Sequence, residues 1–202
     1  MDFISTIAIA MGASWVSGMK LYAAVAMLGL LGRFASLRLP GELEILTSWW
    51  VIGVASALYV IEFVADKIPL VDSTWDVIHT FIRIPAGAVI AAAAFGDFDR
   101  GVQIVAFLIG GGLALSSHGA KTTTRAAVNT SPEPFSNIAV SLAEDVLAVG
   151  AVLLAAFYPI LLFIVVGIGL LISIIVLPKI IRYIRGVIRK ARRLIGSDST
   201  KA

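Results

Sequence analysis

Ionisable side chains are concentrated in residues 62–83 of an otherwise apolar chain. Glu62 and Asp66 are four residues apart, so on a helix they share one face. A second set falls at i, i+4, i+7 and i+11 and forms one helical stripe: its members are Asp72, Asp76, His79 and Arg83. Acids placed in this way could bind a cation or relay protons. Because a charge at the bilayer centre costs roughly 2.5–3.5 kcal/mol, such groups indicate either a function or an ion pair.

Basic side chains form a comparable stripe further along the chain. His118, Lys121 and Arg125 fall at i, i+3 and i+7, and with Arg83 they could receive a phosphate or a carboxylate. The three glycines at 110–112 do not form a phosphate loop, because the required spacing to a Lys-Ser/Thr pair is missing. The alternative is that these bases only neutralise the acids and fix the helix packing.

A further pair of acids, Glu144 and Asp145, lies in the second half of the chain. Adjacent residues diverge by about 100° on a helix, so only one of the two can face the centre squarely. Glu144 is three residues from Ser141 and shares its face, which favours Glu144 as the inward-facing acid.

The sequence assigns no catalytic group and no cofactor. Asp76 and His79, with Glu62 or Glu144, could form an oxygen-and-imidazole metal site. No compact metal-ligand motif is present, so a hydrogen-bonded structural histidine is favoured and any metal stays undetermined. The chain has no cysteine, which excludes thiolate sites and cysteine nucleophiles. The residues expected to form a central ligand-binding site are Glu62, Asp76, His79, Arg83, His118, Lys121, Arg125 and Glu144.

Composition identifies the class of protein that must position these residues. The 202 residues are 59% hydrophobic and only 14% charged, with a mean hydropathy of +0.97. Soluble domains are about 45–50% apolar and about 25% charged, so this chain is an integral membrane protein. A span needs about 20 apolar residues, which predicts an all-α domain over residues 1–178 with about six spans. The expected spans are 3–31, 48–65, 72–95, from 102 onward, 137–157 and 160–177. The beginning of the chain has no basic region and no clear cleavage site, so we interpret it as a retained span.

Glycine, proline and short polar residues predict where these helices break or begin. Residues 12–20, GASWVSGMK, are either a close-packing face or a break in the first span. Asp72 is a candidate N-cap for the third span, and Pro85 should kink or end that helix. The glycines at 110–112 predict a helix break or a close backbone contact. Pro178 should end the last span.

Residues 179–195 differ in character from the spans. Seven of the sixteen basic residues lie there, interleaved with apolar residues at helical spacing. This pattern predicts an amphipathic helix on a surface of anionic lipid, and its charge predicts a cytoplasmic C-terminus. With six spans, the N-terminus would be cytoplasmic too. We expect a disordered tail at 196–202 and no nucleic-acid partner.

Two halves of the chain look related. SGMK at 17–20 and HGAK at 118–121 both place Gly-x-Lys after an apolar half-span. Each then leads through a proline-containing loop to a span with two acids. Three spans per half would make the second copy inverted, with paired broken helices around a midplane site. The alternative is that glycine is simply common in membrane helices.

Three longer motifs are similar to one known family. They are ADKIPLVDSTWDVIHTFIRIPAGA at 65–88, GGGLALSSHGAK at 110–121 and SPEPFSNIAVSLAED at 131–145. Together they resemble the bacterial membrane proteins catalogued as domain of unknown function 4126, over about residues 18–178. The resemblance implies a small multi-pass protein of the bacterial inner membrane and supplies no function.

These observations favour a small transporter or channel-like protein with a central charged site for an ion or a small anionic solute. One alternative is an intramembrane enzyme acting on a lipid or lipid phosphate. Another is a structural subunit of a membrane complex, whose charges only pair with one another. A homo-oligomer is compatible with each of these hypotheses.

Overall fold

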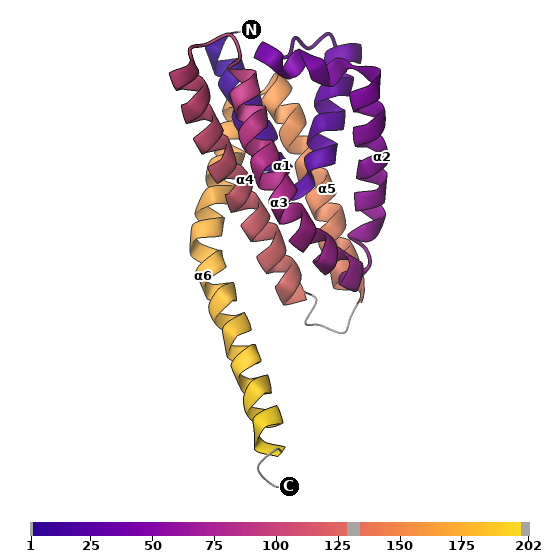
Figure 1. The fold of residues 1–202 in the computed structure, drawn as a ribbon, viewed down its shortest axis with the longest axis vertical. Helices are drawn as coiled ribbons and strands as arrows, with labels where there is room; N and C mark the ends of the chain where they lie inside the picture. Colours follow the sequence, from indigo (N-terminus) through magenta and orange to yellow (C-terminus); the bar gives the residue numbers. More distant parts are fainter. Residues whose placement is uncertain (1, 129–133, 199–202) are drawn as a thin grey trace.

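The computed structural model describes residues 2–128 and 134–198, and this part of the chain is a bundle of helices without strands (Figure 1). The all-α prediction is therefore confirmed. The elements are α1 (Phe3–Phe34), the 3-10 helix η1 (Gly41–Thr47), α2 (Trp49–Ala65), α3 (Pro69–Ala94), α4 (Arg100–Val128), α5 (Pro134–Phe157) and α6 (Pro159–Asp198).

Several of these helices have the length and composition of membrane spans. Four qualify, namely α1, Thr74–Ala94 in α3, α4, and Phe135–Phe157 in α5. A fifth arises if η1 and α2, bent by 73°, are counted as one span. The apolar part of α6, Pro159–Ile175, is shorter. The membrane character predicted from composition is confirmed, whereas six spans are not.

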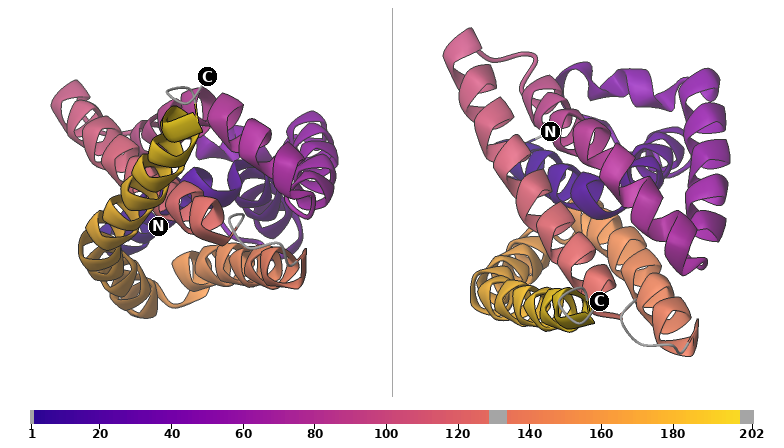
Figure 2. Two further views of the ribbon diagram at one scale, coloured as in Figure 1. Left: turned by 90° about the horizontal axis from the view of Figure 1, so that it is seen from below. Right: turned by 60° about the horizontal axis from the view of Figure 1, so that its bottom comes forward.

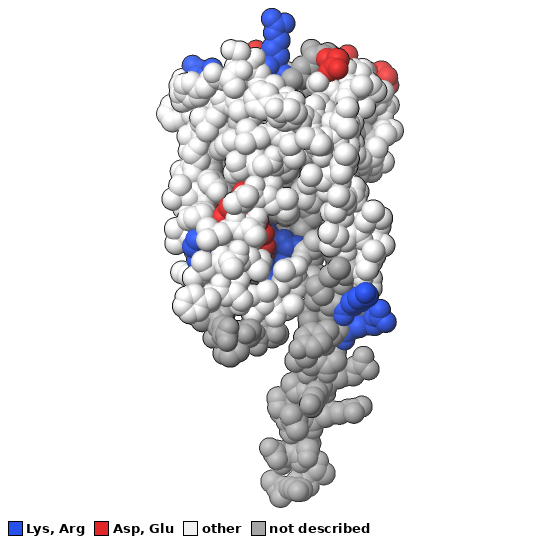
Figure 3. Space-filling view, turned by 180° about the vertical axis from the view of Figure 1, so that it is seen from behind, with Lys and Arg blue, Asp and Glu red and all other residues white. Residues whose placement is uncertain are grey.

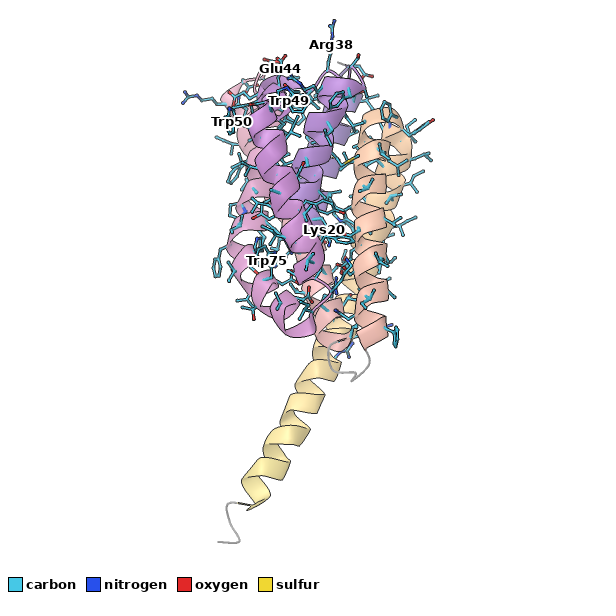
Figure 4. The ribbon with its side chains drawn as sticks, turned by 90° about the vertical axis from the view of Figure 1, so that its right-hand side faces the viewer. Lys20, Arg38, Glu44, Trp49, Trp50 and Trp75 are labelled. Carbon is cyan, nitrogen blue, oxygen red and sulfur yellow. The ribbon has the colours of Figure 1, made fainter. Side chains whose placement is uncertain are left out.

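Helix α1 folds back on itself at Lys20, where the backbone leaves the helical region (φ −145°, ψ 71°). At one end of α1, the ring of Phe3 lies 6.2 Å from that of Phe95, after the end of α3. At the other end, Phe34 lies 5.8 Å from Trp49, at the start of α2. Both ends of α1 therefore lie at one end of the bundle, and Lys20 lies about midway down it (Figures 1 and 4).

This arrangement makes α1 a re-entrant element. At 1.5 Å per residue, its first half is roughly 25 Å long and its second roughly 20 Å, both shorter than a bilayer core of about 30 Å. The predicted break in residues 12–20 is present, but it reverses the chain. Asp2 and the C-terminal end of α6 consequently lie at opposite ends of the bundle (Figure 1). The prediction that both termini are cytoplasmic stays a prediction.

Helix α1 occupies the interior, with the other helices arranged around it (Figure 2). Its apolar side chains form much of the core, and Ile9, Val16 and Leu28 are fully buried. A Cβ added to Gly18 would lie 2.1 Å from the carbonyl oxygen of Ala114, so α1 and α4 pack backbone to backbone. The absence of a side chain at residue 18 thus brings the break in α1 against α4.

The polar side chains of α4 satisfy carbonyl groups that the break leaves without helical partners. The last carbonyls of any helix lack intrahelical donors and need others when they are buried. Two such groups are bound from α4: His118 Nδ1 lies 3.1 Å from Gly18 O, and Lys121 Nζ donates to Met19 O at 3.5 Å. Ser117 Oγ also donates to Trp15 O, just before these groups, at 2.6 Å. The predicted basic stripe thus has a structural role at the break.

Helix α4 itself runs unbroken from Arg100 to Val128. Of the two outcomes predicted for residues 110–112, close contact is the one observed, since a Cβ on Gly110 would lie 2.4 Å from that of Ala91. Nothing lies within 4 Å of the corresponding position at Gly112. The expected pair of broken helices is therefore wrong, because only the first of the two breaks exists.

Two local predictions at helix ends, for Asp72 and Pro178, are also wrong, and Pro85 does not end its helix. Ile68 is the N-cap of α3 and Pro69 opens the helix, so Asp72 lies in the first turn. Pro85 and Pro178 both lie inside continuous helices. Residues 179–195 are therefore not a separate helix, and 196–198 complete α6. The side chains from residue 183 onward, and residues 199–202 of the predicted tail, lie outside the described part.

Candidate functional site

A network of buried charges surrounds the break in α1. Its members come from five helices and their ends, and each exposes less than a tenth of its surface. They are Lys20, Glu62, Asp66, Asp72, Asp76, Arg83, Lys121, Arg125, Glu144 and Asp145. We refer to these ten residues as the buried charge network.

All eight predicted site residues lie in or beside this network. The six charged ones belong to it, and His79 and His118 are buried next to it. Sequence reasoning omitted Lys20, Asp66, Asp72 and Asp145 from the site. The sequence did contain signals for three of them. Lys20 lies in the predicted break, Asp66 is four residues after Glu62, and Asp72 is four residues before Asp76.

Arg83 links α3 to α2 and to the break. Its guanidinium donates to Glu62 and, at 2.8 Å, to Asp76 Oδ1. Its backbone carbonyl accepts a hydrogen bond of 2.9 Å from Ser17 Oγ in α1. Both charge partners are themselves buried, so removing either would leave an unpaired charge in a medium that solvates it poorly.

Two ammonium groups converge on Asp66, just after α2. Lys20 binds Asp66 and also lies 2.8 Å from Asp145 Oδ1. Lys121 lies 3.2 Å from Asp66 Oδ2 and 3.2 Å from Asp76 Oδ1, between these two carboxylates. The break in α1 is therefore fixed by ion pairs as well as by hydrogen bonds to its carbonyls.

Arg125 joins α4, α5 and the end of α2. It binds Glu144 in a bidentate manner at 3.2 and 2.8 Å, the geometry that suits guanidinium and carboxylate best. It also donates to Asp66 O at 3.1 Å and to Asn137 Oδ1 at 2.7 Å. Asn137 in turn donates to Asp66 O at 3.1 Å.

Both histidines use their two ring nitrogens in hydrogen bonds within the protein. For His79, Nε2 lies 3.0 Å from the hydroxyl of Tyr22 and Nδ1 lies 2.8 Å from Trp75 O. For His118, Nε2 lies 2.7 Å from Thr80 Oγ1, and Nδ1 binds the break carbonyl of Gly18. This geometry favours the structural interpretation of His79 over the metal-ligand interpretation.

The charges of the network do not balance. Among the described residues it contains six acids and four bases, a formal charge of −2 if every group is ionised. Lys67 approaches Asp145 to 3.9 Å, but its side chain is 24% exposed and lies at the edge. Each buried base contacts at least two acids. The excess charge is therefore negative.

Several carboxylate oxygens of the network accept no hydrogen bond from the described part of the chain. Both oxygens of Asp72 are in this position, and the nearest cationic nitrogen recorded for it is Arg125 Nη1 at 3.8 Å. Single oxygens of Glu62, Asp76 and Asp145 share this property. Buried polar atoms are normally paired, so these oxygens indicate a capacity to accept a proton or a cation.

Three acids come close enough to resemble a metal site. One oxygen each of Asp66, Asp72 and Asp76 lies within 4.8 Å of the others. The ammonium of Lys121 already lies between Asp66 and Asp76. A metal ion there would have to displace it, so the arrangement does not favour resident metal.

Two of these acids precede the apolar stretch Thr74–Ala94 and follow α2. Burial raises the pKa of Asp72 to about 7, opposed by Arg125 and reinforced by Asp76. Burial also opposes ionisation of Asp66, but Lys121 and Lys20 outweigh it and hold its pKa well below the usual range. Neighbouring acids of one cluster thus differ sharply in their affinity for a proton.

The network approaches the surface in a few places. Figure 3 shows acidic and basic atoms at mid-height among uncharged residues, apart from the charged groups near the two ends of this face. The side chains of Glu144 and Asp145 are 11% and 9% exposed. Beside the network, an apolar groove of about 540 Å³ between α1, α2 and α3 is lined in part by Tyr22, the partner of His79.

The model of a protein family matches residues 7–179, a range that includes the whole buried charge network. The chain belongs to the family described as Domain of unknown function (DUF4126). This confirms the resemblance carried by the three motifs. No curated protein and no solved structure matches the chain.

Proposed function

We propose that this DUF4126 protein is a small transporter or channel-like membrane protein whose central site takes up a proton or a small cation. One observation carries the proposal: at a helix break inside a membrane bundle, six buried acids face four buried bases. Ionisable groups within membrane segments are costly and usually mark a pathway or relay. The excess of acids indicates the sign of the charge that is bound.

The pairing of the bases argues against an anionic solute. Arg83 and Arg125 each bind two or more oxygens, and Lys20 and Lys121 each contact two or more acids. An incoming phosphate or carboxylate would have to displace these partners and increase the negative charge. A proton or cation would instead reduce it.

The re-entrant α1 supports a transport function. Discontinuous helices whose ends meet near the midplane build the sites of many secondary transporters. At the break the partial negative charge of one helix C-terminus meets the partial positive charge of the next helix N-terminus, so the side chains decide the sign of the bound charge. The predicted inverted repeat stays a prediction.

The distribution of charge supports one orientation in the membrane. Lys179 and Arg182 begin the basic part of α6, and this charge supports a cytoplasmic C-terminal end in a bacterial inner membrane. Asp2 and both ends of α1 would then face the outside. Contact of the basic part of α6 with anionic lipid remains part of this proposal.

The structural-subunit hypothesis is favoured by one observation, the extent to which the charges are paired. It predicts that neutralising a network residue changes stability alone. The transporter proposal predicts a change in flux at conditions where the variant is still folded.

A liposome assay separates the two hypotheses. The purified protein is reconstituted with a pH-sensitive dye inside, a potential is imposed with potassium and valinomycin, and internal pH is followed. Parallel assays use sodium, potassium and magnesium indicators. The proposal expects protein-dependent entry of protons or one cation, reduced in Glu62→Gln and retained in Asp97→Asn, a change at an exposed acid. Rates equal to those of empty liposomes for all these ions would overturn it.

A further inference from the structure

Asp72 is the least satisfied charged group of the network. Its side chain is fully buried in the first turn of α3. Neither of its oxygens accepts a hydrogen bond within the described residues. Asp76 Oδ1, by contrast, binds Arg83, and Asp145 Oδ1 lies 2.8 Å from Lys20. Among the described acids of the network, Asp72 alone has both oxygens in this state.

The groups facing Asp72 come from several elements. Asp66 follows α2, Asp76 is one turn further along α3, and Lys121 and Arg125 come from α4. From α5, Asn137 and Glu144 occupy the guanidinium of Arg125, and from α1 Lys20 binds Asp66. The nearest base is therefore engaged elsewhere and lies at 3.8 Å from Asp72 Oδ2, too far for a hydrogen bond.

The surroundings of Asp72 suit a proton better than a metal ion. A metal ion shared with Asp66 and Asp76 would meet the ammonium of Lys121, 3.2 Å from both. A proton needs no extra space. Protonation would also remove the negative charge from a carboxylate whose oxygens accept no hydrogen bond within the described residues.

We propose that Asp72 is the residue of the network that binds and releases the proton. The inference rests on the proposed function, because it names proton as the cation and Asp72 as its carrier. Protonation reduces the net negative formal charge of the network from −2 to −1. The raised pKa of Asp72, about 7, agrees with a proton exchanged near neutral pH.

Proton binding can be measured without any flux. Infrared difference spectra of the purified protein, recorded between about pH 5 and about pH 8.5, report the C=O stretch of a protonated carboxyl group directly. We expect a band that titrates near neutral pH in the wild type and in Asp97→Asn and that is missing in Asp72→Asn. A band absent from the wild type, or unchanged in Asp72→Asn, would overturn the assignment.

Thermal melting gives a second readout with a defined sign. A carboxyl group whose pKa is raised on folding stabilises the folded state at low pH, and that stability is lost as the pH rises toward 7. The wild-type melting temperature should fall by about 5 °C or more between about pH 5 and about pH 8.5. Asp72→Asn should lose most of this dependence and melt above wild type at the higher pH. Parallel pH profiles for the two proteins would refute the proposal.

Two further results keep this inference distinct from the transport function. A titrating Asp72 band together with no ion flux would support the proton site and reject transport. Proton flux that survives in Asp72→Asn would support transport and reject Asp72 as the carrier. If Asp72→Asn does not fold, Asp72→Glu serves in its place. The C=O band of this variant should still titrate but at a shifted frequency, and a band at the wild-type frequency would reject the assignment.

Discussion

Replacing Gly18 by alanine tests the packing that holds the break in α1 against α4. A Cβ at residue 18 would lie 2.1 Å from the carbonyl oxygen of Ala114 and 2.0 Å from Ser117 Oγ. The carbonyl belongs to the backbone of a continuous helix and cannot turn aside. The hydroxyl is the donor to Trp15 O at 2.6 Å, so its displacement would also break this hydrogen bond.

The size of the effect follows from these two contacts. Forcing an extra carbon into a packed interior costs about 1–3 kcal/mol, occasionally more. Losing a buried hydrogen bond costs about 0.5–1.5 kcal/mol. Against this, alanine gains up to about 1 kcal/mol over glycine in helix propensity. The net destabilisation of Gly18→Ala should therefore be about 0.5–4.5 kcal/mol.

Gly112→Ala is the matched control, because nothing lies within 4 Å of its added Cβ. It should be neutral or stabilise the protein by up to about 1 kcal/mol. Both variants are compared with wild type by thermal melting in the same detergent, where 1 kcal/mol corresponds to about 2–4 °C for a chain of this size. A melting temperature of Gly18→Ala equal to that of wild type or of Gly112→Ala would refute the packing described here.

Two other predictions concern the buried charges and the topology. Arg125→Met should destabilise the protein by about 3–5 kcal/mol, since it leaves the buried carboxylate of Glu144 without its bidentate donor. Arg182→Met changes an exposed residue and should have the melting temperature of wild type. Equal melting temperatures for the two variants would contradict the network. Because the chain has no cysteine, single cysteines placed at Asp2, Arg38 and Lys179 can be labelled selectively in intact cells with an impermeant maleimide. The first two should react and the third should not, and reaction of Arg38→Cys without Asp2→Cys would show that α1 crosses the membrane.

Much of the local structure could be predicted from the sequence because its causes are local. Composition identified a membrane protein. Helical spacing placed His118, Lys121 and Arg125 on one stripe, and all three are buried together. Such features depend on neighbours within a few residues, which the printed sequence contains.

The course of α1 could not be predicted in the same way. GASWVSGMK indicated a break or a packing face, but a break alone does not determine the direction in which the chain continues. That direction depends on which distant groups satisfy the freed carbonyls. Here His118 and Lys121, about a hundred residues away in sequence, do so.

The sequence by itself determined that this protein lies in a membrane and carries acids and bases on helical stripes. Only the tertiary structure decided that, among the described residues of the network, every base is engaged and acids exceed bases by two. It also decided that Asp72 accepts no hydrogen bond from this part of the chain. The physical reason is that ion pairs join residues far apart in the chain, such as Lys121 with Asp66 and Arg125 with Glu144. Residue types set the charges available for pairing, whereas the relative placement of the helices determines which pairs form and which charge remains.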